Sequence, residues 1–381
     1  MSTAWFDLRR FLNELERLVN TESPSHDLPA MRAFAELVAD IGAAHLGRPA
    51  EVLERDGRRH LRWTFGTGTA RVLHLAHMDT VWPLGTLAGM PFSITDGIVR
   101  GPGCYDMKGG LLMSFHAAAE LLRRHGEAGL EGLTILCTAD EEIGSPTSRS
   151  LIEETARGAD AALVLESAGP DGELKIGRKG VSFYELRVHG RAAHAGVEPE
   201  KGVNAGIEAA HQVLRIAQLG NPGAGTSVVP SVLRAGTVTN TVPAEASLAI
   251  DSRATTVAEQ RRVDADLRGL APVNSAAGLE LLGGINRPPM EAENAMGLFA
   301  RAQRIAHRLG HRPVRSITVG GGSDGNFTAG IGTPTLDGLG TVGGGAHAAN
   351  EHVEISWLEE RTALLAELTA ELLGHAAAAR T

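Results

Sequence analysis

Short apolar runs alternate with longer helical stretches over the first 166 residues. The runs Arg71–Ala76, Leu133–Thr138 and Ala161–Leu165 are mainly apolar and short, which is typical of strands buried on both faces. Apolar residues recur at helical spacing over Leu28–Ile41 and Met107–His125. Strands separated by helices in this way predict an α/β domain with a mixed, largely parallel sheet.

The pattern changes near Gly180, where strand-like alternation begins. Strands are predicted over Val181–Gly190, Leu233–Val242, Ala246–Arg253 and Leu279–Leu282. Helices are predicted over Val203–Leu219, after the first strand, and over Val257–Leu270, after the third. This βαββαβ order fits a small ferredoxin-like domain. We expect it to be inserted, as residues 180–287, into a larger domain made of residues 1–179 and 288–381.

The chain then returns to the larger domain. We expect a helix over Ala292–Leu309, a strand around Pro334–Leu336 and a closing helix over Trp357–His375. A length of 381 residues is long for one hydrophobic core, which also favours two domains.

Composition and charge narrow the class of protein. With 43% hydrophobic and 21% charged residues the chain is of ordinary globular type. Its net charge of -9 argues against a nucleic-acid partner or a lipid-binding surface, and no apolar run is long enough to span a membrane. Two cysteines cannot form a disulfide framework, so we expect a cytoplasmic protein. The N-terminal segment resembles an amphipathic helix and not a signal peptide.

Histidines and acids stand where the predicted strands end and in two glycine-rich segments. They are His77, Asp106, the adjacent pair Glu141 and Glu142, Glu166 and His347. Ligands collect beyond the carboxyl ends of parallel strands, so the three strand ends indicate one rim of the sheet. Imidazoles and carboxylates are the ligand set that suits a pair of zinc-like ions. If these residues converge, the chain is a metal-dependent hydrolase.

Each residue also has a structural alternative. His77 followed by Asp79 fits a metal-bound imidazole with a carboxylate that orients it, or a capped turn. Asp106 precedes a helix and could be its N-cap instead of a ligand that bridges two cations. Glu141 and Glu142 could form a solvated acidic turn, although adjacent carboxylates repel each other unless cations compensate them.

Motifs spread over nearly the whole chain resemble one known family. They are HMDT, DMKGG, DEEIGS, GRAAHAGVEPEKGVNA, GTVTNTVP, DSRA, GGGSDGN and DGLGTVGGGAH. The family is the di-zinc amidohydrolases of glutamate carboxypeptidase, acetylornithine deacetylase and succinyl-diaminopimelate desuccinylase, and the glutamate carboxypeptidase branch looks closest. The resemblance implies a zinc exopeptidase-like catalytic domain with an inserted domain that serves as a lid and as a dimer interface.

The resemblance also implies roles for the residues of the metal site. His77 and Glu166 would hold one divalent ion, Glu142 and His347 the other, and Asp106 would bridge the two. The ions would be Zn²⁺, with Co²⁺ or Mn²⁺ as alternatives. Asp79 would support His77, and Glu141 would be the general base that takes a proton from the attacking water. The peptide bond after Asp106 is usually cis in this family.

Residues of the inserted domain would contact the substrate. The resemblance implies that His194 reaches the active site of the other subunit in a homodimer and stabilises the developing oxyanion. Asn240, Arg253, Arg287 and Gly321 would line the substrate site, and Arg253 can clamp a carboxylate through two hydrogen bonds. A surface ion pair is the structural alternative for Arg253.

The predicted reaction is hydrolysis of an amide bond in a small-molecule or short-peptide substrate. It would release a C-terminal amino acid, with glutamate as one candidate, from a peptide or an N-acyl amino acid. One alternative is a deacylase of the acetylornithine or succinyl-diaminopimelate type. An alternative of another class is a non-catalytic family member that binds a metal or a peptide.

Overall fold

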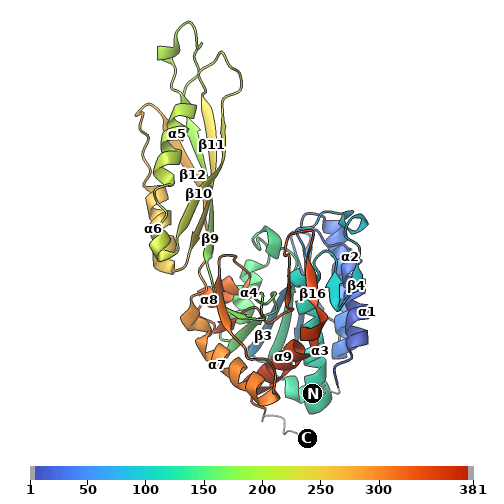
Figure 1. Ribbon diagram of the computed structural model, residues 1–381. Coiled ribbons are helices and arrows are strands. Elements are labelled where there is room, and N and C mark those ends of the chain that lie inside the picture. Colours follow the sequence, from blue (N-terminus) through green and yellow to red (C-terminus); the bar gives the residue numbers. More distant parts are fainter. Residues whose placement is uncertain (1–4, 376–381) are drawn as a thin grey trace. The chain divides into compact units, whose positions relative to one another are not determined.

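The computed structural model describes residues 5–375, which form two compact units (Figure 1). Within those residues, unit 1 comprises 5–177, Ala292–Val319 and 323–375, and unit 2 comprises Arg178–Glu291 and Gly320–Gly322. The outermost residues of the predicted first helix and of the larger domain, 1–4 and 376–381, lie outside the described residues. No helix within residues 5–375 combines the length and apolar composition of a membrane span.

Unit 1 is built on a six-stranded sheet with the strand order β1-β2-β6-β3-β7-β14. The strands are β1 (Glu51–Arg55), β2 (Arg58–Thr64), β3 (Val72–His77), β6 (Leu133–Thr138), β7 (Ala161–Val164) and β14 (Thr335–Leu336). Strands β6, β3, β7 and β14 run parallel, and the β1–β2 hairpin adds an antiparallel edge. The predicted α/β fold with a mixed, largely parallel sheet is confirmed.

Helices cover both faces of this sheet, which is why its central strands are apolar along their whole length. The helices of unit 1 are α1 (Leu8–Val19), α2 (Leu28–Leu46), α3 (Gly109–His125), α4 (Arg149–Ala156), α7 (Ala292–Leu309), α8 (Gly325–Gly330) and α9 (Leu358–Leu372). On one face His74 of β3 hydrogen-bonds Ser114 of α3 and Thr369 of α9. On the other face Leu73 and Leu75 share a core with α4 and α8.

A small antiparallel sheet in unit 1 connects two distant loops. Its strand order is β15-β16-β5-β4, with bounds β15 (Gly343–Gly344), β16 (His352–Glu354), β5 (Ile98–Arg100) and β4 (Ser93–Thr95). Val353 of β16 pairs with Val99 of β5. This pairing sets the loop after β5 beside the loop between β15 and β16. A further two-stranded sheet pairs β8 (Leu174–Arg178) with β13 (Ser316–Val319).

Unit 2 is an antiparallel sheet with two helices. Its strands, in the order β10-β11-β9-β12, are β9 (Gly180–His189), β10 (Ser227–Ala235), β11 (Glu245–Ala254) and β12 (Gly278–Arg287). Helices α5 (Ala205–Ile216) and α6 (Val257–Arg268) pack on it, and their residues Ala209, Ile216, Val263 and Leu267 share its core. The chain order is βαββαβ, as the sequence predicts for the inserted domain.

Several predicted elements have other bounds in the structure. Strand β12 is longer than the predicted Leu279–Leu282, and α2 extends beyond the predicted end at Ile41. Two further differences lie near the predicted functional residues. The strand predicted over Leu233–Val242 is wrong in its position, because β10 ends at Ala235. Gly236 has a φ of 71°, a left-handed conformation that ends the strand. The helix predicted from Met107 begins at Gly109, because residues 104–108 form a separate turn in which Asp106 and Met107 are not helical.

Candidate metal centre

His77 and Glu166 meet at the carboxyl edge of the unit 1 sheet. His77 is the last residue of β3, and Glu166 follows the end of the neighbouring parallel strand β7. The Nε2 atom of His77 lies 3.5 Å from Oε1 of Glu166. Its Nδ1–H donates to the backbone carbonyl of Asp79 at 2.9 Å. That hydrogen bond fixes the tautomer and leaves Nε2 as the atom that can bind a metal.

Asp106 lies between two imidazoles. Its Oδ1 is 3.3 Å from Nε2 of His77, and its Oδ2 is 3.3 Å from Nε2 of His347. The peptide bond from Asp106 to Met107 is cis, as the family resemblance implies. Asp106 is not the N-cap of α3, because that helix begins at Gly109 and has no side-chain cap.

Glu142 and His347 form the other side of this cluster. Glu142 lies in the turn after β6, and its Oε2 is 3.2 Å from Nε2 of His347. Its Oε1 is buried and has no hydrogen-bond partner within residues 5–375. The His347 side chain is 52% exposed and therefore lies at the mouth of the cluster. A buried carboxylate oxygen without a partner is costly, and a bound cation would remove that cost.

Asp79 supports the glutamate pair more directly than it supports His77. Its Oδ1 accepts the backbone N–H of Glu141 at 3.1 Å and its Oδ2 accepts that of Glu142 at 3.1 Å. Ser25 Oγ donates to Oδ2 at 2.7 Å. The distance from Oδ1 to Nδ1 of His77 is 3.5 Å, longer than a hydrogen bond. The completely buried Asp79 therefore fixes the backbone from which both glutamates project.

The charges of the cluster shift the pKa values of its members. Burial and the neighbouring Asp106 raise the pKa of Glu142 to about 7, against a hydrogen bond with His347 that lowers it. Hydrogen bonds to Asp106 and Glu142 raise the pKa of His347 to about 10. The acids thus hold a proton on the imidazole, and a divalent cation would take the place of that proton.

The spacing of the ligand atoms fits metal ions. With bonds of about 2.0–2.1 Å in a tetrahedral arrangement, the ligand atoms of a zinc site lie roughly 3.3 Å from one another. The Nε2 atom of His77 lies 3.5 Å from Glu166 and 3.3 Å from Asp106, and that of His347 lies 3.3 Å from Asp106 and 3.2 Å from Glu142. Most direct hydrogen bonds between imidazole and carboxylate groups are shorter. The two oxygens of Asp106 face different histidines, so the donor set suits two ions with one bridging carboxylate. Glu141 lies beside the cluster, with a carboxylate oxygen within 4.8 Å of ligand atoms of His77 and Glu166.

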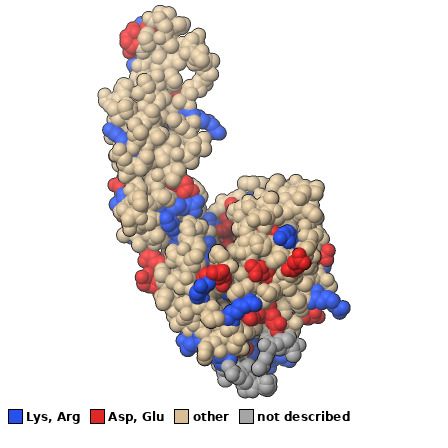
Figure 2. Space-filling view, viewed as in Figure 1, with Lys and Arg blue, Asp and Glu red and all other residues tan. Residues whose placement is uncertain are grey.

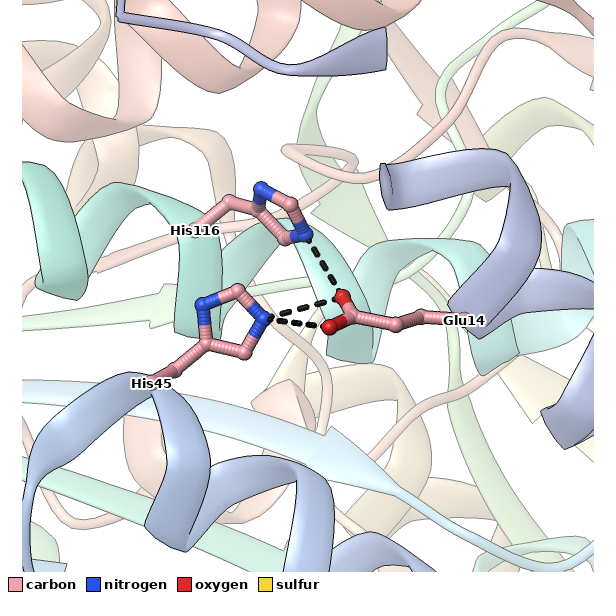
Figure 3. A group of neighbouring side chains, drawn as sticks. All are labelled: Glu14, His45 and His116. Carbon is pink, nitrogen blue, oxygen red and sulfur yellow. Dashed lines mark hydrogen bonds and ion pairs between the residues drawn. The ribbon is translucent and has the colours of Figure 1, made fainter. Parts of the chain in front are cut away.

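A second group of histidines and a carboxylate is different in kind (Figure 3). His45 Nε2 lies 3.1 and 2.9 Å from the two carboxylate oxygens of Glu14, and His116 Nε2 lies 2.9 Å from Oε2. Arg10 Nε donates to Oε1 at 2.9 Å. These are hydrogen-bond lengths, and a guanidinium shares the carboxylate. We interpret the Glu14 group as a buried tether between α1, α2 and α3.

The predicted substrate residues belong to unit 2. His194 is exposed, and its Nδ1 accepts the backbone N–H of Gly196 at 3.1 Å. Asn240 is also exposed. It lies near His194, because the backbone carbonyl of Asn240 accepts the N–H of Ala195 at 2.9 Å. The structure thus brings the predicted residues His194 and Asn240 together within unit 2.

The other substrate candidates already have partners. Arg253 makes two hydrogen bonds of 2.8 Å to Asp251, so a substrate carboxylate must compete with this ion pair. Arg287 is buried and donates to Asn286 Oδ1 at 3.2 Å. The carbonyl of Gly321 accepts from the buried Arg178 at 3.1 Å.

Glu351 is not among the residues predicted from the sequence. This carboxylate is completely buried and hydrogen-bonds the loop that carries Asp106. The one signal in the sequence that could have indicated Glu351 is its position four residues after His347. A sequence does not show that an acid is buried.

The model of the protein family described as Peptidase family M20/M25/M40 matches residues 73–371 of this chain. The chain belongs to this family. The match extends over every residue assigned above to the metal cluster. The M20 chain is therefore a metallohydrolase that acts on peptides or acyl-amino acids, and membership implies metal ions, typically two zinc ions.

Two relatives illustrate its place in the M20 family. The chain is 34% identical to carboxypeptidase G2 of a Pseudomonas species over 374 residues, which cover 95% of this chain and 89% of the relative. It is 30% identical to a succinyl-diaminopimelate desuccinylase of Methylorubrum populi over 334 residues, which cover 78% and 81% of the two chains.

Solved structures share the M20 fold over nearly the whole chain. The metallo-carboxypeptidase Sso-CP2 from Sulfolobus solfataricus has a TM-score of 0.74 at 17% identity, over 97% of this chain and 99% of that one. The aminopeptidase PepT from Bacillus cereus has a TM-score of 0.69 at 23% identity, over 97% and 100% of the two chains.

Proposed function

We propose that this M20 hydrolase is a carboxypeptidase-type amidohydrolase that releases a C-terminal amino acid, with glutamate as the candidate, from a short peptide or an N-acyl amino acid. The position of Asp106 carries the two-metal hydrolase part of the proposal, because its two oxygens each lie 3.3 Å from a different histidine. The similarity to carboxypeptidase G2 supports the substrate class, since it extends over 95% of this chain.

In this proposal the residues of the cluster divide between two metal positions. His77 and Glu166 belong to one position, Glu142 and His347 to the other, and Asp106 to both. Two divalent ions held there, with Zn²⁺ as the first candidate for both, would polarise the amide carbonyl and lower the pKa of the attacking water. The orphaned Oε1 of Glu142 supports the assignment, because it is a buried acceptor that needs a cation.

Glu141 is the proposed general base. Its backbone N–H is held by Asp79, which aims the side chain from a fixed turn beside the cluster. A carboxylate in that place accepts a proton from the attacking water and delivers it to the departing amine. The C–O bond to the carbonyl carbon forms first and gives a tetrahedral oxyanion, and the C–N bond then breaks as the amine receives the proton, so that the products are a carboxylate and an amine.

Unit 2 is proposed to complete the site in a homodimer, with His194 and Asn240 contacting the substrate. Two observations support the dimer: β10 is an edge strand, and it exposes Val229, Val232 and Leu233. Most of the face of unit 2 seen in Figure 2 is uncharged. An exposed apolar edge is typical of a surface that pairs with another copy.

The test combines metal content with substrate choice. Metals per subunit would be measured by mass spectrometry, and turnover would be followed on N-acyl-glutamate, dipeptides and succinyl-diaminopimelate. We expect about two metals per subunit, and we expect cleavage of the glutamate compounds to be lost on chelation and restored by Zn²⁺. Preference for succinyl-diaminopimelate would overturn the carboxypeptidase assignment in favour of the desuccinylase alternative.

Glu141→Gln separates binding from chemistry. The variant is expected to keep both metals and to lose at least about 100-fold in kcat, because the proton acceptor is gone. Exposed Glu36→Gln on α2 is the matched control and should behave like the wild type. Turnover by Glu141→Gln at the wild-type rate would remove Glu141 as the base.

A further inference from the structure

Glu351 accepts four N–H groups with a single buried carboxylate. Its Oε1 accepts the backbone N–H groups of Tyr105 and Asp106, both at 3.0 Å. Its Oε2 accepts the backbone N–H of Gly103 at 2.9 Å and the indole N–H of Trp82 at 2.8 Å. A carboxylate offers about four acceptor positions, so each is used.

Three of these donors belong to the loop that ends in the proposed bridging ligand. Asp106 has a φ of -119° and a ψ of 95°, so it is not helical, and its backbone N–H donates to Glu351. Buried backbone N–H groups need a partner, and successive ones in a turn form a concave site for an anion. Glu351 supplies that anion from within the protein.

Glu351 also ties this loop to the segment of His347. The two residues lie in one short stretch, in which Ala348 N–H donates to Gly345 O and Glu351 N–H donates to Ala348 O, both at 2.9 Å. Strand β16 begins at the next residue and pairs with β5, which precedes the loop of Asp106. The backbone that carries one metal ligand is thus bonded through Glu351 to the backbone that carries another.

We propose that Glu351 is a positioning residue of the metal centre, which sets the separation between Asp106 and His347 by clamping their two loops together. The inference rests on the proposed assignment of Asp106 and His347 as ligands. The hydrogen bonds that the Glu351 side chain makes within the described structure go to backbone N–H groups and to Trp82 and not to the side chains of Asp106 or His347, so its effect on metal binding passes through the backbone.

The alternative is a role in folding alone, and the two roles predict different measurements. If Glu351 only stabilises the fold, its removal lowers the unfolding midpoint and leaves the folded fraction with normal metal affinity. If it positions the ligands, the folded protein itself binds metal less tightly. The coordination geometry changes as well, because Asp106 no longer lies midway between the two histidines.

Glu351→Gln is the main variant. It keeps the size of the side chain but places an amide NH₂ against backbone N–H donors, so at least two bonds are lost. Trp82→Phe is a milder variant that removes only the indole donor. Glu208→Gln is the matched control, because Glu208 is also buried and accepts two backbone N–H groups, those of Val273 and Asn274 at 2.9 Å, in unit 2.

Four measurements would be made on each full-length variant. They are metal affinity by competition with a chromogenic chelator, the absorption spectrum of the Co²⁺-loaded protein, steady-state kinetics for kcat and KM, and the unfolding midpoint. Glu351→Gln is expected to lose about 10–100-fold in metal affinity and to shift the Co²⁺ spectrum, with kcat falling more than KM changes. Trp82→Phe should shift the same quantities less, and Glu208→Gln should lower only stability.

The inference would be overturned if both Glu351→Gln and Trp82→Phe had the metal affinity and the Co²⁺ spectrum of the wild type. If Glu351→Gln fails to fold, Trp82→Phe decides alone. A wild-type protein that binds no metal would instead overturn the proposed function, so the two failures are distinguishable.

Discussion

Backbone amides are the main partners of the acids that support the proposed metal centre. Asp79 accepts the N–H groups of Glu141 and Glu142, and Glu351 accepts those of the loop before Asp106. Such bonds hold the backbone of a proposed ligand in place without touching its side chain. A sequence shows which acids follow a strand, but it does not show which backbone groups they accept.

Asp79→Asn tests this support at a single residue. The amide nitrogen of asparagine cannot accept a hydrogen bond, so the N–H of either Glu141 or Glu142 loses its acceptor. We expect kcat to fall about 10–100-fold with a smaller loss of metal. Steady-state kinetics with metal analysis would check this, with exposed Asp40→Asn as the control. A normal kcat would show that Asp79 is dispensable.

The proposed ligands at the ends of strands were predictable from the pattern, and those that depend on loops were predictable only by resemblance. His77, Glu142 and Glu166 follow apolar strands that are parallel neighbours, so the pattern alone places them at one edge. Asp106 and His347 come together through the β5–β16 pairing, between strands of three residues each. Strands so short leave no periodic signal in the sequence. The hydrogen bonds between Glu351 and the loop before Asp106 depend on the pairing of these two strands, so the sequence does not show them either.

Among the elements, the first three helices are joined at Glu14. Burial alone would raise the pKa of Glu14, but hydrogen bonds from His116, His45 and Arg10 outweigh burial and hold it well below its usual range. A carboxyl whose pKa is lowered in the folded state stabilises the protein above its unfolded pKa of about 4.3, and this stabilisation is lost as the pH falls further.

Glu14→Gln is therefore expected to destabilise the protein in a pH-dependent way. At pH 7 the loss should be about 1–3 kcal/mol, the range for breaking a buried hydrogen-bond network. The gap between variant and wild type should narrow below about pH 4.3, where the wild-type carboxyl begins to lose its advantage. Denaturant unfolding at several pH values would measure both. A gap that widens as the pH falls below 4 would contradict this assignment.

Helix α3 begins in close contact with the chain beside Glu166. A methyl group built on Gly110 would overlap the carbonyl oxygen of Leu165, and that oxygen belongs to backbone. Gly110→Ala should therefore cost about 1–3 kcal/mol and weaken metal binding, because Glu166 is displaced. Gly297 in α7 has open space around the same position. Gly297→Ala should be neutral or stabilising by about 0.5–1 kcal/mol, and thermal unfolding of both variants gives the comparison.

At the scale of the whole molecule, β10 leaves an apolar edge on unit 2. Leu233 is 50% exposed in that strand. If the proposed dimer forms there, Leu233→Glu should convert it to monomers, because a charge at the centre of an apolar interface is costly to desolvate. Val273→Glu changes an exposed apolar residue in a loop outside β10 and should leave the dimer intact. Analytical ultracentrifugation would distinguish them, and a dimeric Leu233→Glu would exclude this edge.

The order of the metal-centre residues along the chain bears on how the protein is made. Strand β14 pairs with β7, yet the whole of unit 2 is synthesised between them. A nascent chain that has just completed unit 2 already carries His77, Asp106, Glu142 and Glu166, but His347 and Glu351 are still in the ribosome or not yet translated. Such a chain carries the proposed ligands of the first metal position, His77, Glu166 and Asp106, whereas the second position still lacks His347. With the ligands proposed above, the second metal position is completed only when translation is almost finished and β14 has paired with β7.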